Sequence, residues 1–172
     1  LQAGDSIVFY EIDPVVAEIA RTNFSYLQTP ADLDIRFGDA RRLLEQEERA
    51  GAAPYGALVV DAFTGDGIPV HLLTSEALGT YLRRVEAGAP VVLHISNRYV
   101  RLGPVVAAGA ASVGTPAALR VRTEDLAVSE DKSIYAAIGG IDKLGWQPLP
   151  AQGPLWTDDH ASLLPLWIRG WN

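Results

Sequence analysis

Three acidic residues stand at the ends of consecutive predicted strands: Glu11, Asp39 and Asp61. Ligands of open α/β sheets bind at the carboxyl ends of the strands, so these side chains are expected on one rim of the sheet. A carboxylate after the second strand of a nucleotide-binding unit is suited to accept hydrogen bonds from both ribose hydroxyls, and one after the next strand from an adenine amino group. The third acid is expected nearer the switch point of the sheet, where chemistry would take place.

Each acid also has a structural interpretation. Asp39 and Asp61 precede helical or turn segments, where a helix cap or an Asx-turn explains either of them equally well. Glu11 favours ligand binding, because glutamate is a poor cap and this one lies inside an apolar strand. Asp13 favours a helix cap, because Pro14 follows it at the first helical position. The three acids taken together favour a functional rim.

The segments that would position these acids alternate between strand and helix patterns. Strands are expected at 6–12, 33–37, 56–62, 90–96, 119–126 and 134–138, and helices at 14–27, 40–50, 73–85 and 102–113. The turn around 129–132 is too short for a parallel crossover, so the last two strands should form an antiparallel hairpin. The pattern predicts a doubly wound α/β sheet with an antiparallel end. Residues 1–140 are expected to form one nucleoside-binding domain, and 141–172 an irregular tail rich in Trp and Pro that packs on it.

Composition narrows the class of protein. The 172 residues carry a net charge of −7, which argues against binding to nucleic acid and allows attraction of cationic ligands. The chain has no cysteine, which excludes disulfides and thiol catalysis, and its three histidines are widely spaced, so no metal site is expected. It has no methionine and begins at Leu1, so we expect sequence upstream. No membrane span is visible, and a cytoplasmic location is expected.

Three motifs surround these acids: Tyr10-Glu11-Ile12-Asp13-Pro14, Gly38-Asp39-Ala40-Arg41 and Asp61-Ala62-Phe63-Thr64-Gly65-Asp66. These motifs resemble those of the polyamine aminopropyltransferases, the spermidine synthases. The segments 94–99 and 156–159 are similar to a bacterial subgroup in which such domains are fused to transporter-like membrane segments. The resemblance runs from about Asp5 to Pro165.

The resemblance implies a class I methyltransferase-like (Rossmann-like) fold that binds decarboxylated S-adenosylmethionine as co-substrate. It implies that Glu11 holds the ribose and that Asp39, flanked by Gly38 and Ala40, holds the adenine. The acceptor would be a diamine such as putrescine, which is a dication. Asp61 would be the carboxylate that takes a proton from the attacking amine or orients it, and Asp66 would bind the amine or its distal charge.

Two features depart from the family pattern. Asp61 and Asp66 are five residues apart, whereas spermidine synthases usually place their two acids three apart, so the amine pocket would differ or accept another nucleophile. The family's first strand and its glycine-rich loop would precede Leu1 and are missing. Without that strand we expect the sheet to lack its centre, between the strands at Ser6 and Gly56, with backbone groups unpaired. The chain would then be a fragment of a longer protein, or have a site completed by another chain, and would be weak or inactive alone.

The remaining polar residues include two histidines, an asparagine and two aspartates. His71 and His94 are interpreted as structural, although His94 reaches the rim if its strand ends early. Asn97 lies past that strand and is a candidate substrate contact. Asp158 and Asp159 are interpreted as loop anchors or helix caps, with a place in the amine site as the alternative.

Two other functions remain open. One is an S-adenosylmethionine-dependent methyltransferase on the same fold, which differs in tolerating the carboxylate of the donor. The other is a non-catalytic domain that senses a nucleotide or polyamine, or supports an attached membrane module. A homodimer is also compatible with the sequence.

Overall fold

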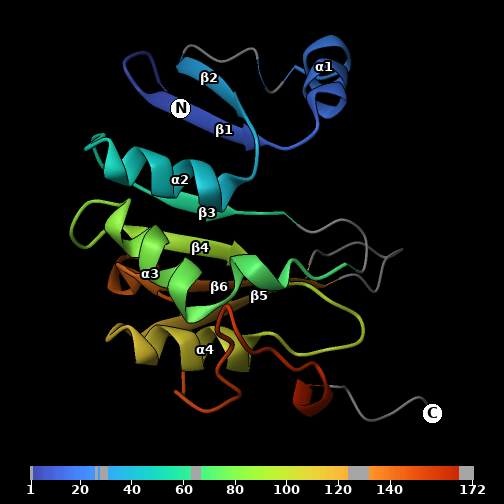
Figure 1. Cartoon of the computed structure of the whole chain (residues 1–172), viewed down its shortest axis with the longest axis vertical. Coiled ribbons are helices and arrows are strands. Elements are labelled where there is room, and N and C mark those ends of the chain that lie inside the picture. The colour runs from blue at the N-terminus through green and yellow to red at the C-terminus, as the bar shows by residue number, and fades with distance from the viewer. Residues whose placement is uncertain (1, 26, 28–30, 63–66, 124–131, 167–172) are drawn as a thin grey trace. The chain divides into compact units, whose positions relative to one another are not determined.

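The computed structural model describes residues 2–25, 27, 31–62, 67–123 and 132–166 of the chain. The chain divides into two compact units, 1–52 and 53–172. The predicted division into a body of 1–140 and a tail of 141–172 is a different one and stays a prediction. Each unit is described below by itself, with the labels of Figure 1.

The first unit is a two-stranded parallel sheet with two helices (Figure 1). Its elements are β1 (Ser6–Glu11), α1 (Pro14–Asn23), β2 (Asp32–Phe37) and α2 (Ala40–Arg49). The strands pair from Ser6 opposite Asp32 to Glu11 opposite Phe37, so both carboxyl ends lie at the same end of the pair. All four elements were expected from the sequence and are confirmed.

Helix α1 begins as the sequence predicts and ends earlier. The Asp13 carboxylate accepts a hydrogen bond from Val15 N at 2.8 Å, and Pro14 occupies the first helical position. The helix ends at Asn23 because Phe24 is extended (ψ 145°), so the apolar spacing to residue 27 does not continue as helix. The buried side of α1 is made of small alanines, while Val15, Val16, Ile19 and Phe24 are exposed.

The second unit is a five-stranded mixed sheet in the order β3-β4-β6-β5-β7. Its strands are β3 (Leu58–Val60), β4 (Pro90–His94), β5 (Ala117–Thr123), β6 (Lys132–Gly139) and β7 (Gln147–Leu149). β3 and β4 are parallel, and β4–β6, β5–β6 and β5–β7 are antiparallel, which confirms the predicted hairpin. The helices are α3 (Ser75–Arg83) and α4 (Gly103–Ser112), with short 3-10 turns at Val70–Leu72, Ile141–Lys143 and Leu164–Leu166.

The core of the second unit lies between the sheet and these two helices. Leu78 and Tyr81 of α3 and Val105 and Val106 of α4 are all 1% exposed or less. α3 and α4 approach closely at Gly109, where an added Cβ would lie 2.7 Å from Leu78 Cδ1. Burial of these side chains, together with that of the central strands, stabilises the sheet that contains β3 and β4.

The predicted irregular tail contains a strand. β7 adds to the edge of the sheet beside β5, although the sequence around Pro148 gave no strand signal. Trp156 is 1% exposed, and its indole Nε1 donates a hydrogen bond to Ser162 O at 3.1 Å. Arg101 N donates to Leu166 O at 3.0 Å. The described part of the tail therefore packs on the rest of the second unit, to which it belongs.

β1 and β3 each have one hydrogen-bonded neighbour among the described strands. These are the two strands between which the sequence predicts a missing centre. β3 is shorter than the predicted segment 56–62, and Val59 in its middle is 66% exposed. Among the described helices, none has the length and apolar character that crossing a membrane requires.

Candidate functional site

The strand pair β3–β4 brings together two polar side chains that are distant in the sequence. Val60 lies opposite Leu93 in the parallel register, so Asp61 and His94 both stand at the carboxyl ends of their strands. The Asp61 Oδ1 atom lies 2.8 Å from His94 Nδ1. The Asp61 side chain is 61% exposed and that of His94 is 23% exposed. The pair is therefore an accessible carboxylate backed by a largely buried imidazole.

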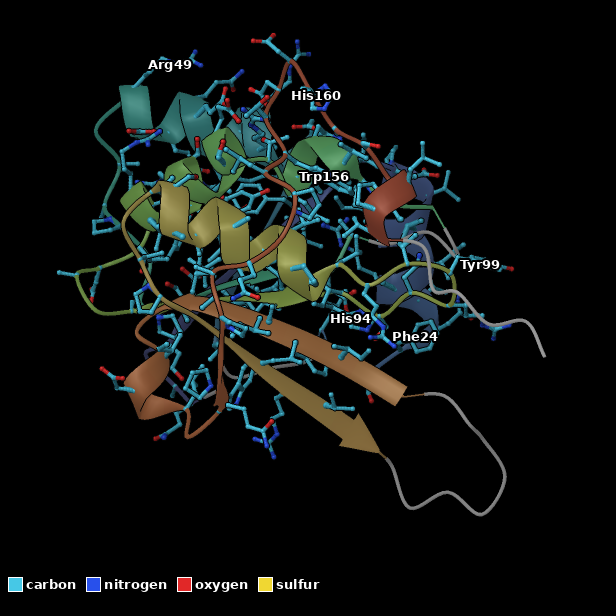
Figure 2. The ribbon with its side chains drawn as sticks, turned by 90° about the horizontal axis from the view of Figure 1, so that it is seen from below. Phe24, Arg49, His94, Tyr99, Trp156 and His160 are labelled. Carbon is cyan, nitrogen blue, oxygen red and sulfur yellow. The ribbon has the colours of Figure 1, made fainter. Side chains whose placement is uncertain are left out.

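Further contacts hold the other side of the His94 ring, which is labelled in Figure 2. Its Nε2 lies 2.7 Å from Ser96 Oγ, and that hydroxyl oxygen accepts a hydrogen bond from Ile134 N of β6 at 2.8 Å. The ring centroid lies 5.1 Å from that of Tyr135, the next residue of β6. β4 ends at His94, which meets the condition that the sequence sets for this residue to reach the rim.

In the first unit, backbone amides engage the strand-end acids. Glu11 Oε1 accepts a hydrogen bond from Asp13 N at 2.9 Å, and Gly38 N donates to Glu11 O at 2.9 Å. Gly38 has φ +143°, a conformation that a residue with a Cβ rarely adopts. Gly38 therefore allows the backbone to turn between the end of β2 and Asp39.

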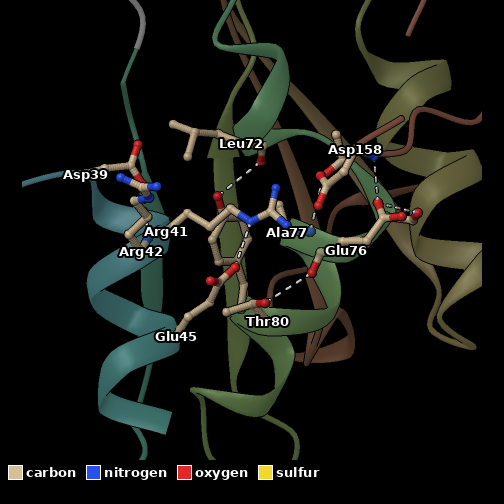
Figure 3. A network of polar contacts seen from close by, with 12 residues as sticks. Asp39, Arg41, Arg42, Glu45, Leu72, Glu76, Ala77, Thr80 and Asp158 are labelled. Atoms are coloured by element: carbon tan, nitrogen blue, oxygen red, sulfur yellow. Dashed lines mark hydrogen bonds and ion pairs between the residues drawn. The ribbon is translucent and has the colours of Figure 1, made fainter. Parts of the chain in front are cut away.

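Asp39 is the N-cap of α2 (Figure 3). Its Oδ1 atom accepts a hydrogen bond from Arg42 N at 2.9 Å, and Ala40 is the first helical residue. Asp39 therefore caps a helix, as one of its two interpretations from the sequence predicts. If Asp39 also binds a ligand, it does so while capping α2.

Asp158 anchors the segment after Trp156 to the start of α3 (Figure 3). Thr74 Oγ1 donates to Asp158 Oδ1 at 2.8 Å and accepts from Ala77 N at 3.3 Å, as the N-cap of α3. Asp158 N donates to Glu76 Oε2 at 3.2 Å. These contacts match the loop-anchor interpretation of Asp158, while Asp159 is exposed.

Asn97 closes a tight turn, because its Oδ1 accepts from Tyr99 N at 2.9 Å and from Val100 N at 3.0 Å. Asp66 lies outside the described residues. Within the described ranges, no cluster of three or more His, Asp or Glu side chains is arranged to hold a metal ion. The sequence analysis interprets His94 as structural, whereas the structure places it beside Asp61. This contact depends on the register between two strands, which the sequence alone does not show.

No family model matches the chain. A curated relative, the polyamine aminopropyltransferase of Vibrio vulnificus (strain CMCP6), is 41% identical over 68 residues, which are 40% of this chain and 22% of the relative. The match thus spans about a fifth of that relative's length.

Solved structures with a similar fold share less sequence. A probable spermidine synthase from Corynebacterium glutamicum has a TM-score of 0.54 at 19% identity, covering 77% of this chain and 46% of that one. Human methyltransferase-like protein 13, solved with SAH, has a TM-score of 0.57 at 21% identity, covering 87% and 64%. An O-methyltransferase from Bacillus cereus, also solved with SAH, has a TM-score of 0.55 at 18% identity, covering 81% and 64%. Over those 68 residues the chain is therefore similar in sequence to a polyamine aminopropyltransferase, and its fold is that of the class I methyltransferases.

Proposed function

We propose that the chain is the transferase part of an aminopropyltransferase, which moves a propylamine group from decarboxylated S-adenosylmethionine to a diamine such as putrescine. The observation that carries the proposal is the Asp61 carboxylate, exposed at the carboxyl end of β3 and held by His94 at 2.8 Å. The similarity to a polyamine aminopropyltransferase supports the same reaction. Because the match covers a fifth of that relative, the activity is proposed for the protein to which this chain belongs.

Asp61 is assigned to the acceptor amine. A diamine arrives as a dication, and the attacking nitrogen must lose a proton before its lone pair is available. Asp61 accepts that proton and orients the nitrogen. The lone pair then forms the new N–C bond, the C–S bond of the donor breaks, and its electron pair remains on sulfur, which becomes a neutral thioether. Since a sulfonium is a good leaving group, positioning and deprotonation of the amine are the work left to the protein.

Glu11 and Asp39 are assigned to the nucleoside of the donor. The Glu11 carboxylate would accept hydrogen bonds from the ribose hydroxyls, and Asp39 would accept one from the adenine amino group, with Gly38 and Ala40 beside it. The hydrogen bonds from Asp13 N and Arg42 N orient these two carboxylates. Charge-assisted hydrogen bonds of this kind are short and directional.

The acidic character of the chain supports a cationic acceptor. A net charge of −7 attracts a dication before any specific contact is made. Asp66 is assigned to the amine or to its distal charge, and Asn97, Asp158 and Asp159 are further candidates for contact with the substrate. Asn97 Oδ1 and Asp158 Oδ1 accept hydrogen bonds from residues of their own unit, while Asp159 is exposed.

A second candidate is an S-adenosylmethionine-dependent methyltransferase. It is favoured by solved neighbours of similar fold that are methyltransferases solved with SAH. The two functions differ in the donor, because a methyltransferase must accommodate the carboxylate that decarboxylated S-adenosylmethionine lacks.

Calorimetric titration of the chain with both donors separates these functions. We expect tighter binding of decarboxylated S-adenosylmethionine, and weaker binding of it by the Glu11→Ala variant. Equal or reversed preference would favour the methyltransferase. Binding of neither donor would contradict both assignments for this chain and favour a non-catalytic role.

A further inference from the structure

The hydrogen bonds around His94 identify which ring nitrogen carries the proton. A carboxylate only accepts hydrogen bonds, so the contact between Asp61 Oδ1 and His94 Nδ1 requires a hydrogen on Nδ1. On the other side, Ser96 Oγ accepts from Ile134 N and keeps its own hydrogen as a donor for His94 Nε2, 2.7 Å away. The contact with Asp61 therefore assigns a hydrogen to Nδ1, and in the Nδ1–H tautomer Nε2 is an acceptor for the Ser96 hydroxyl.

The two partners of this contact differ in how firmly they are held. His94 closes the five-residue strand β4, pairs with Tyr135 in the antiparallel register, and its ring lies beside the Tyr135 ring. Asp61 follows the three-residue strand β3, and its side chain is 61% exposed. An exposed aspartate samples several rotamers unless a partner restricts it. The imidazole is therefore the fixed member that determines where the carboxylate points.

We propose that His94 is a positioning residue for Asp61, held in the Nδ1–H tautomer by Ser96. Its hydrogen bond occupies Asp61 Oδ1 and directs Oδ2 to the amine proton. This inference rests on the proposed function, because it assigns His94 to the reaction that Asp61 performs. Ser96 contributes by keeping Nε2 as an acceptor, and it does not contact the substrate.

Nitrogen NMR of the chain with labelled histidine tests the tautomer without any turnover. The chain has three histidines, so three imidazoles contribute, and the His94→Asn variant identifies the His94 signals by their loss. In the neutral ring we expect the proton-bearing nitrogen to be Nδ1. A hydrogen on Nε2 would overturn the inference, whatever the chain catalyses.

Two variants test the positioning role. The side-chain amide nitrogen of Asn is bonded to Cγ, as Nδ1 of His is. His94→Asn therefore keeps a hydrogen-bond donor that faces Asp61. Gln places its amide nitrogen one atom further, where it can reach Ser96 and not Asp61. We expect His94→Gln to lower kcat by about 10- to 100-fold and His94→Asn to lower it less, because only Asn keeps a hydrogen bond to Asp61, with the same Kd for the sulfonium co-substrate in both variants.

The control is His71→Asn, a substitution of an exposed histidine outside this cluster, which should leave kcat unchanged. Equal kcat for the Asn and Gln variants, or a loss of donor binding in both, would show a purely structural role and overturn the inference. An unchanged chain with the Nδ1–H tautomer and no aminopropyl transfer would instead overturn the proposed function, and with it the assignment of His94 to that reaction.

Discussion

The two units of the chain hold their strand-end carboxylates in different ways. In the first unit, backbone amides a few residues away engage Glu11 and Asp39, so the local chain fixes each acid. In the second unit, a side chain from the neighbouring strand engages Asp61. A carboxylate fixed by its own turn suits the recognition of a rigid nucleoside. A carboxylate held by an imidazole from another strand suits proton transfer, because the imidazole can influence the carboxylate without any change in the turn that carries it.

The units also differ in their cores. Among the described residues, the buried apolar side chains of the first unit are three alanines and Leu44. In the part of the chain that the structure describes, the second unit holds the buried Trp156 and Tyr81 and every buried Leu, Ile and Val side chain except Leu44. A two-stranded sheet with a small core is marginal by itself, whereas five strands with two helices are not. The structure therefore places the proposed catalytic acid on the better packed of the two units.

The largest expected effect comes from the Asp61→Asn substitution, which removes the proton acceptor and keeps the shape. Aminopropyl transfer should fall by about 10²- to 10⁴-fold, the usual contribution of a general base. Donor affinity, measured by calorimetry, should stay unchanged because the nucleoside is assigned to the first unit. The matched control is Asp142→Asn, an exposed acid of the same unit that should change neither quantity. Unchanged turnover in the Asp61 variant would remove Asp61 from the mechanism.

Trp156→Ala tests the contrast between the cores. It removes a large side chain that is 1% exposed, together with the bond from its indole to Ser162 O. The free energy of unfolding, from urea denaturation, should fall by about 3–5 kcal/mol. Trp146→Ala, at a half-buried position, should cost less. Equal losses for the two variants would contradict a core centred on Trp156.

Asp39→Asn separates capping from ligand binding in the first unit. Asparagine caps helices about as well as aspartate, so the thermal midpoint should not change. Loss of the charge should weaken donor binding by about 10- to 100-fold, from the ~1.5–3 kcal/mol of a hydrogen bond to a charged group. If calorimetry gives the same Kd as for the unchanged chain, Asp39 is only a cap.

The smallest effect is expected at Thr74, which joins α3 to the loop of Asp158. Thr74→Val keeps the volume and removes the hydroxyl that caps Ala77 N and donates to Asp158. The free energy of unfolding should fall by about 0.5–2 kcal/mol. Thr74→Ser keeps the hydroxyl and should be the milder variant by urea denaturation. A greater loss for Ser than for Val would show that methyl packing, and not the cap, matters at this position.

Much of the fold could be predicted from local pattern. Proline after Asp13 marks the start of α1, and the alternation of strand and helix segments predicts the sheet connectivity. The misses have physical reasons. β7 contains Pro148, which argues against a strand in a sheet interior and is tolerated here because β7 lies at the edge of the sheet. The sequence predicts too long a strand for β3, because a hydrophobic run indicates that a strand is present but not where it begins and ends.

The candidate site could be predicted only in part. Asp39 and Asp61 look alike in the sequence, since both follow a strand and precede a helix or loop. The structure makes Asp39 a cap and pairs Asp61 with a histidine 33 residues away. That pairing depends on the parallel register of β3 and β4, which tertiary packing sets and which hydrophobic pattern alone does not reveal.

The most direct test of the proposed function is to identify, by mass spectrometry, the products that the protein to which this chain belongs forms from decarboxylated S-adenosylmethionine and putrescine. We predict spermidine and the neutral thioether nucleoside in equal amounts, with both products lost in the Asp61→Asn variant. A methylated acceptor formed from S-adenosylmethionine, or no transfer from either donor, would contradict the proposal.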